Sequence, residues 1–224
     1  MMKKIKFTAS GFSLSAFLCL FSFSVARAAG LPSWYNLNAH VKLVESKAKG
    51  ESAAGKFELQ KFQSKKMKLG SHQLQLVDAR FGANKNQSDN DYILSEIFSD
   101  PPESAKPLFQ LVDKGACDSK AVEDVSVKKL GFVADIGIYF LQIKLVSPHC
   151  TNSEILSPKI FMVVQEKKKS IEKIYESAIA NDGKYTVKFE NELIRLQYTK
   201  GSDSKSSNVD LTWDEKSQSF TEQP

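Results

Sequence analysis

The chain has 224 residues, of which 42% are hydrophobic and 25% are charged, and its formal net charge at pH 7 is +5. This composition predicts a globular protein with a substantial core and excludes a disordered chain. Four of the positive charges lie within the first 28 residues, so the remaining 196 residues have a net charge of only +1. Because a nucleic-acid-binding domain retains a strong basic excess, we expect no nucleic acid as a partner.

The first 28 residues have the three zones of a secretory signal peptide of bacterial type. A start with three lysines precedes an uncharged run that is most apolar over 16–23. Small residues then surround the expected cleavage position: Ala26, Ala28 and Ala29. We predict cleavage after Ala28 and a periplasmic or secreted protein. The alternative is an uncleaved membrane helix over 7–26, because about 20 residues span a bilayer, but seven serine, threonine and glycine residues dilute that run.

Two cysteines remain after cleavage, Cys117 and Cys150, because Cys19 lies within the signal peptide. An even pair in an exported protein predicts one disulfide bond. The bond would close a loop of 34 residues, for which the chain-entropy relation gives about 3.8 kcal/mol of stabilisation. A redox pair or half of a metal site is the alternative, although no C-x-x-C motif occurs and His149 has too few partners as a ligand.

The first element expected after the signal is a helix with one apolar face. The members of that face are Leu37, Val41, Val44 and Ala48, and Gly50 is the expected stop. An edge strand over 41–44 is the alternative. From residue 56, apolar residues alternate with lysine and glutamine, which predicts antiparallel strands near 57–59, 67–69 and 74–76 with one exposed face.

Two polar segments interrupt the first half. The segment 82–91 is rich in Asn and Asp and predicts a surface loop, which is also the place for a boundary if 29–224 is more than one domain. The run Asp100-Pro101-Pro102-Glu103 is typical of a helix start, and Pro107 limits that helix to one or two turns.

The densest apolar region lies in the second half, where 136–145 and 160–164 are apolar at successive positions. A strand that is apolar on both faces belongs in the middle of a layered structure, so we predict two core strands here. Apolar residues at helical spacing after Ser170 predict a short helix over 171–179, with a strand as the alternative.

The carboxyl-terminal part predicts a hairpin over 185–198 that turns around Asn191. A polar loop is expected over 201–207, then a last alternating strand over 209–213 against which Phe220 returns. The predicted fold class is therefore mainly β (α+β). A single domain, 29–224, forms antiparallel sheets in a sandwich-like body with one to three short helices.

No sequence signature of an enzyme is present, neither a nucleophile elbow, nor a zinc helix, nor a glycine-rich phosphate loop. The three histidines, His40, His72 and His149, are scattered, and we interpret them as structural residues. Oxygen ligands gather in one segment and form a weak calcium candidate: Asn84, Asn86, Asp89 and Asp91. Their spacing lacks the glycine and the terminal glutamate of an EF-hand, so a hydrophilic loop is the preferred interpretation.

Aromatic and basic residues provide two further candidates. Trp34, Tyr35 and Trp213 would stack on sugar rings if they were exposed, but Trp213 continues an alternating strand face and is expected in the core. The lysine run 167–169 would contact anionic lipid or cell-wall polymer, and a solvated turn is the preferred interpretation.

These features predict a non-enzymatic binding or accessory module of the bacterial envelope, without a cofactor, whose partner is an envelope protein or a glycan. An envelope hydrolase and a structural component of an envelope assembly are the alternatives. A hydrolase requires a cleft in which a histidine or paired carboxylates converge. A binding module requires an apolar groove or an exposed strand edge.

Overall fold

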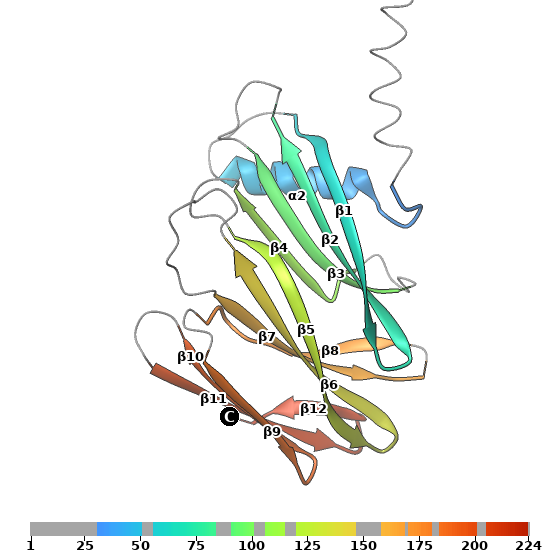
Figure 1. The fold of residues 1–224 in the computed structure, drawn as a ribbon, viewed down its shortest axis with the longest axis vertical. Helices are drawn as coiled ribbons and strands as arrows, with labels where there is room; N and C mark the ends of the chain where they lie inside the picture. The colour runs from blue at the N-terminus through green and yellow to red at the C-terminus, as the bar shows by residue number, and fades with distance from the viewer. Residues whose placement is uncertain are drawn as a thin grey trace, which may run out of the picture. The chain divides into compact units, whose positions relative to one another are not determined.

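The computed structural model describes residues 31–50, 56–83, 91–100, 106–114, 120–146, 158–168, 170–180, 184–200 and 205–223 (Figure 1). The chain divides into two units, 1–35 and 36–224. In the first unit, the backbone N–H of Tyr35 donates a hydrogen bond to the carbonyl of Pro32 at 2.9 Å. The predicted signal peptide with its cleavage site lies outside the described residues. No helix among the described residues is long and apolar enough to cross a membrane.

The predicted first helix is present as α2 (Leu37–Gly50). Asn36 begins it as an N-cap, because its side-chain oxygen accepts a hydrogen bond from the backbone N–H of Ala39 at 3.1 Å. Val44 and Ala48 are fully buried, as the helical spacing predicted. The helix ends at Gly50, the residue predicted to stop it.

The strands of the second unit form three antiparallel four-stranded sheets. The first sheet contains β1 (Glu58–Leu69), β2 (His72–Gly82), β3 (Tyr92–Asp100) and β4 (Phe109–Lys114). The second contains β5 (Ala121–Val133), β6 (Ile136–Val146), β7 (Lys159–Glu166) and β8 (Ile171–Glu176). The third contains β9 (Tyr185–Glu190), β10 (Leu193–Lys200), β11 (Lys205–Asp214) and β12 (Ser219–Glu222). Strands consecutive in the chain are hydrogen-bonded neighbours in every sheet, which confirms the antiparallel, mainly β prediction.

The second sheet lies between the other two, and both of its faces are buried. Leu141 and Ile143 face one core, which they share with residues of the first sheet such as Leu74. Phe140 and Phe161 face the other core, which is shared with the third sheet. The two strands predicted to be apolar on both faces, β6 and β7, therefore lie in the central layer, as expected. Helix α2 crosses the outer face of the first sheet (Figure 1).

The helix predicted over 171–179 is wrong, because this segment contains strand β8 at the edge of the second sheet. In the pairing of β7 with β8, Lys173 is opposite Val164 and Tyr175 is opposite Val163. Ile174, which lies between them, is therefore the extra residue of a bulge. Such a bulge breaks the two-residue alternation and turns the side chains after it to the other face. The resulting apolar spacing resembles that of a helix, although the backbone pairs as a strand.

The carboxyl-terminal hairpin turns at Asn191 and Glu192, as predicted, and both residues have positive φ angles, 51° and 61°. The β5–β6 hairpin turns in the same way at Ala134 and Asp135, with φ angles of 46° and 67°. Two consecutive positive φ angles are typical of a type I′ turn. The polar loop predicted over 201–207 is wrong for its last three residues, 205–207, which begin β11 and pair with β10.

Candidate functional site

Two of the three histidines each contact a carboxylate. In the first pair, His40 Nε2 of α2 lies 3.1 Å from Glu96 Oε2 of β3, and the Glu96 side chain is fully buried. The side-chain amide of Gln110 donates a hydrogen bond of 2.6 Å to Glu96 Oε1. Because Glu96 is enclosed between helix and sheet, the pair joins α2 to the first sheet and offers no surface to a substrate.

The second pair belongs to a larger cluster around Glu166 at the end of β7. Glu166 Oε1 accepts hydrogen bonds from the Ser71 backbone N–H at 2.7 Å and from the Ser71 hydroxyl at 2.6 Å, and it lies 2.9 Å from His72 Nδ1. The Tyr139 hydroxyl donates to Oε2 at 2.7 Å. Burial alone would raise the pKa of Glu166, but these hydrogen bonds outweigh it and lower the pKa to about 2. Burial and the hydrogen bond to Glu166 together raise the pKa of Tyr139 to about 12.

This cluster contains the residue types of a Ser-His-Glu triad, but its geometry is that of a clamp. In a nucleophilic triad the serine hydroxyl gives its proton to the imidazole, and the carboxylate binds the opposite ring nitrogen. Here the Ser71 hydroxyl donates to the carboxylate itself, and Nδ1 of His72 is near both groups. A Cβ atom at Gly70, whose φ is +58°, would overlap the Glu166 carboxylate and the Tyr139 hydroxyl. The cluster therefore fixes the tip of the β1–β2 hairpin to the second sheet.

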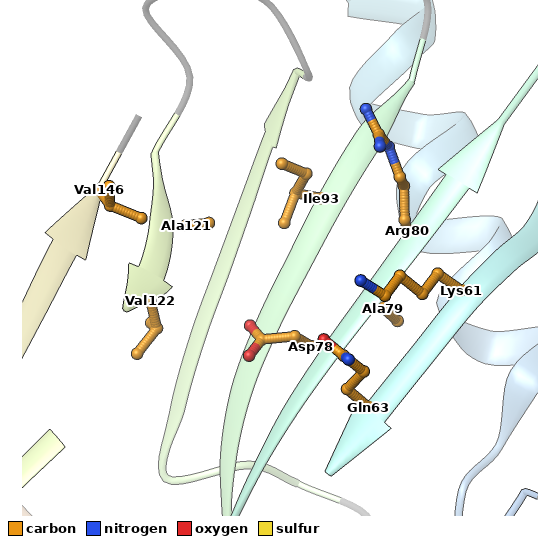
Figure 2. Close-up of a pocket in the computed structure, with 9 residues that line it drawn as sticks. All are labelled: Lys61, Gln63, Asp78, Ala79, Arg80, Ile93, Ala121, Val122 and Val146. Atoms are coloured by element: carbon orange, nitrogen blue, oxygen red, sulfur yellow. The ribbon is translucent and has the colours of Figure 1, made fainter. Parts of the chain in front are cut away.

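An open concave site lies at the other end of the same two sheets. On β2, the side chains that face the second sheet are buried and apolar at Leu74 and Leu76, then polar at Asp78 and Arg80. At this polar end the sheets enclose a cavity of about 310 Å³ (Figure 2). We call it the groove, and its lining residues are Lys61, Gln63, Asp78, Ala79, Arg80, Ile93, Ala121, Val122 and Val146.

The groove residues of the first sheet form two cross-strand rows. Lys61 pairs with Arg80, which pairs with Ile93 on β3. Gln63 pairs with Asp78 in the next row. Cross-strand partners point to the same face of a sheet, and Figure 2 shows these side chains together on the strands of the first sheet. The small apolar side chains of β5 and β6, Ala121, Val122 and Val146, form the opposite wall.

Asp78 is the partly buried charged group of the groove. Its Oδ1 atom accepts a hydrogen bond of 2.5 Å from the Ser95 hydroxyl, which in turn accepts one of 3.2 Å from the backbone N–H of Val122. Burial raises the pKa of Asp78, and the hydrogen bond from Ser95 opposes that effect. Ser95 therefore fixes the carboxylate and connects it to β5.

The basic groups of the groove differ in their partners. Arg80 Nε lies 3.0 Å from Asp91 Oδ2, so its charge is compensated. The side chains of Lys61 and Gln63 are exposed, and within the described part of the chain they make neither hydrogen bonds nor ion pairs. An ammonium and an amide are thus available to a ligand beside a partly buried carboxylate.

The residues singled out from the sequence are not gathered into this site. Trp213 is 8% exposed and packs edge-to-face on Phe220, with ring centroids 5.3 Å apart. In the first unit, Trp34 is half-buried and packs edge-to-face on Tyr35, which is buried. Of the weak calcium candidates, Asp91 is the described one, and it is the ion-pair partner of Arg80. The others, Asn84, Asn86 and Asp89, lie outside the described residues, as do Cys117, Cys150 and His149.

Metal binding and likeness to known proteins give no further assignment. Among the described residues no group of three His, Cys, Asp or Glu side chains could hold a metal ion. Comparison of the chain with protein-family models, curated proteins and solved structures found no match. The site is therefore interpreted from its own chemistry.

Sequence reasoning missed the groove because its residues come from five strands: β1, β2, β3, β5 and β6. One signal was visible in β2, where residues on the same face change from Leu74 and Leu76 to Asp78 and Arg80. This change marks the point at which a buried sheet face becomes a polar one.

Proposed function

We propose that the chain is exported by means of the signal peptide 1–28 and that the mature protein is a non-enzymatic binding module of the bacterial envelope. Its ligand is a small polar molecule that occupies the groove. One observation carries the proposal: the side chains of Lys61 and Gln63, which have no polar partner in the described part of the chain, lie beside the partly buried Asp78 carboxylate in a cavity of about 310 Å³.

The dimensions and lining of the groove support a small ligand. Small-molecule sites begin at volumes of about 300 Å³ and combine apolar walls with a few placed polar groups. The groove has an apolar wall at Ala121, Val122 and Val146 and polar groups on the opposite side. Binding there would bury the ligand against a fixed sheet surface.

The positions of the two described histidines support binding over hydrolysis. His40 and His72 are both engaged with carboxylates outside the groove, at the helix contact and at the hairpin clamp. Among the described residues, the lining contains one carboxylate, Asp78, and no histidine. An envelope hydrolase would need a general base near its substrate, in addition to a carboxylate that is already fixed by Ser95.

We also propose that Cys117 and Cys150 form a disulfide bond in the exported protein. The register of β5 and β6 supports this pairing, because Ala121 and Val146 are cross-strand partners. Each cysteine is four residues beyond its member of that pair in the sequence. The start of β5 and the end of β6 therefore lie at the same end of the second sheet.

The binding proposal is tested by equilibrium dialysis of the purified protein against the low-molecular-mass fraction of the producing cell's envelope. Mass spectrometry identifies the molecules that the protein enriches. We expect the Lys61→Ala/Asp78→Asn double variant to lose that enrichment. The matched control is Lys188→Ala, which removes an exposed lysine of β9 in the third sheet. Equal enrichment by the double variant, or none by the wild-type protein, would show that the groove is not a small-molecule site.

A further inference from the structure

The groove presents two unlike charges that have no ion-pair partner within the described residues. One is the ammonium group of Lys61 on β1, and the other is the carboxylate of Asp78 on β2. Some lysines of the second unit are paired with carboxylates, as in Lys144–Glu123 at 2.6 Å, whereas Lys61 is exposed and has no such partner among the described residues. The two groove charges belong to adjacent rows, because Lys61 pairs with Arg80 and Gln63 pairs with Asp78.

The first row carries an accessible positive charge, and the second row carries a negative one. Like charges directly opposite each other on neighbouring strands are destabilising, and Lys61 stands opposite Arg80. Asp91 compensates Arg80, and the exposed ammonium group of Lys61 is accessible to an anion. In the second row, Asp78 receives one hydrogen bond from Ser95, and a partly buried carboxylate is stabilised most by a cation.

The distance between the rows sets the distance between the two ligand charges. Lys61 and Gln63 are two residues apart on an extended strand, which corresponds to about 6.7 Å along the strand. A single amino acid is too short, because its ammonium nitrogen and carboxyl carbon are separated by only about 2.5 Å. In an extended dipeptide the two charged termini are likewise separated by two residues of chain, so their spacing matches that of the rows.

We propose that the groove binds a zwitterion of dipeptide length, with its carboxylate at Lys61 and Arg80 and its ammonium group at Asp78. The inference rests on the proposed function and names the ligand class of the same site. Small apolar side chains of the dipeptide would contact the wall formed by Val122 and Val146. Burial of Asp78, which raises its pKa, is consistent with a carboxylate that a bound cation would stabilise.

The test uses three probes that differ by one charge each: L-alanyl-L-alanine, its N-acetyl derivative and its carboxyl-terminal amide. Their affinities for the purified protein are measured by isothermal titration calorimetry at pH 7. We expect the free dipeptide to bind at least about tenfold more tightly than either derivative, a factor that corresponds to about 1.4 kcal/mol. Asp78→Asn should abolish the preference over the N-acetyl derivative, and Lys61→Gln should abolish the preference over the amide. Lys188→Gln should change neither preference.

The outcomes separate this inference from the proposed function. If the protein does not bind the free dipeptide, or binds all three probes equally, the zwitterion inference is wrong. The proposed function stands in that case if the envelope fraction still yields a groove-dependent ligand. Preferences that survive both groove variants would also overturn the inference, because binding would then occur elsewhere. Comparison of the probes on the wild-type protein decides the matter even if a variant fails to fold.

Discussion

The Glu166 clamp makes a quantitative prediction about stability and its pH dependence. Glu166→Gln keeps the size of the side chain but removes the charge that accepts hydrogen bonds from Ser71 and Tyr139. A fall in pKa from 4.5 to about 2 corresponds to at most about 3.4 kcal/mol at 1.36 kcal/mol per unit. Screening by solvent at this partly exposed position reduces that to about 1–2 kcal/mol. We therefore expect Glu166→Gln to lower the free energy of unfolding at pH 7 by about 1–2 kcal/mol.

The sign of the pH effect follows from the lowered pKa. A carboxylate with a lowered folded-state pKa contributes its full stability above the unfolded-state pKa, near 4.5, and loses it as the pH falls towards about 2. Urea unfolding of the wild type and the variant at pH 7 and at pH 2.5 measures this difference. The difference should be largest at pH 7 and shrink in acid. Glu190→Gln, an exposed change on β9, is the control. An equal cost at both pH values, or no cost at pH 7, would refute the clamp.

Three further predictions follow from the turn, the cysteine pair and the groove. Ala134 has a φ of 46°, so Ala134→Gly should raise the free energy of unfolding by about 0.5–1 kcal/mol. The control Ala178→Gly, which is not in a turn of positive φ, should not raise it. A lower free energy of unfolding for Ala134→Gly would show that the turn is not strained. Cys117→Ser/Cys150→Ser should destabilise the exported protein by about 3–4 kcal/mol, and two titratable thiols in the native wild type would show that no bond exists. The pKa of Asp78 is raised above its ordinary value of 3.8, so the affinity for L-alanyl-L-alanine should rise with pH as Asp78 ionises above that value. Asp78→Asn should remove that rise. The same pH profile in both proteins would argue against contact with Asp78.

Much of the fold was predictable where a segment's own periodicity decides its environment. β6 and β7 are apolar at successive positions, so both of their faces must be covered, and they lie in the central sheet. Helix α2 was predictable because Val44 and Ala48 repeat at helical spacing and both are buried. In these elements the local pattern and the tertiary environment agree.

β8 was not predictable in this way, because its periodicity is altered by a contact with another strand. The bulge at Ile174 exists only in the pairing with β7, and it moves Tyr175 to the opposite face. Without knowledge of that pairing, the same spacing favours a helix. Backbone hydrogen bonds to β7 make this segment a strand at the edge of the central sheet.

The groove shows a similar limit for the candidate site. The change from Leu74 and Leu76 to Asp78 and Arg80 indicates that one face of β2 becomes polar. However, the position of Lys61 directly opposite Arg80 follows from the β1–β2 register, which includes a bulge between Leu59 and Lys61. A shift of one residue would turn every side chain of a strand to the other face.

The sequence by itself determined the mainly β character, the two strands of the central layer, the first helix and the hairpin around Asn191. It also predicts export and one disulfide bond between the two cysteines that remain after cleavage. Only the tertiary structure decided that Ser71, Tyr139 and Glu166 form a clamp and that Lys61 and Asp78 lie in one groove. The physical reason is that local sequence encodes the period of an element and the faces it must bury. Strand pairing and sheet packing decide which side chains from distant segments meet.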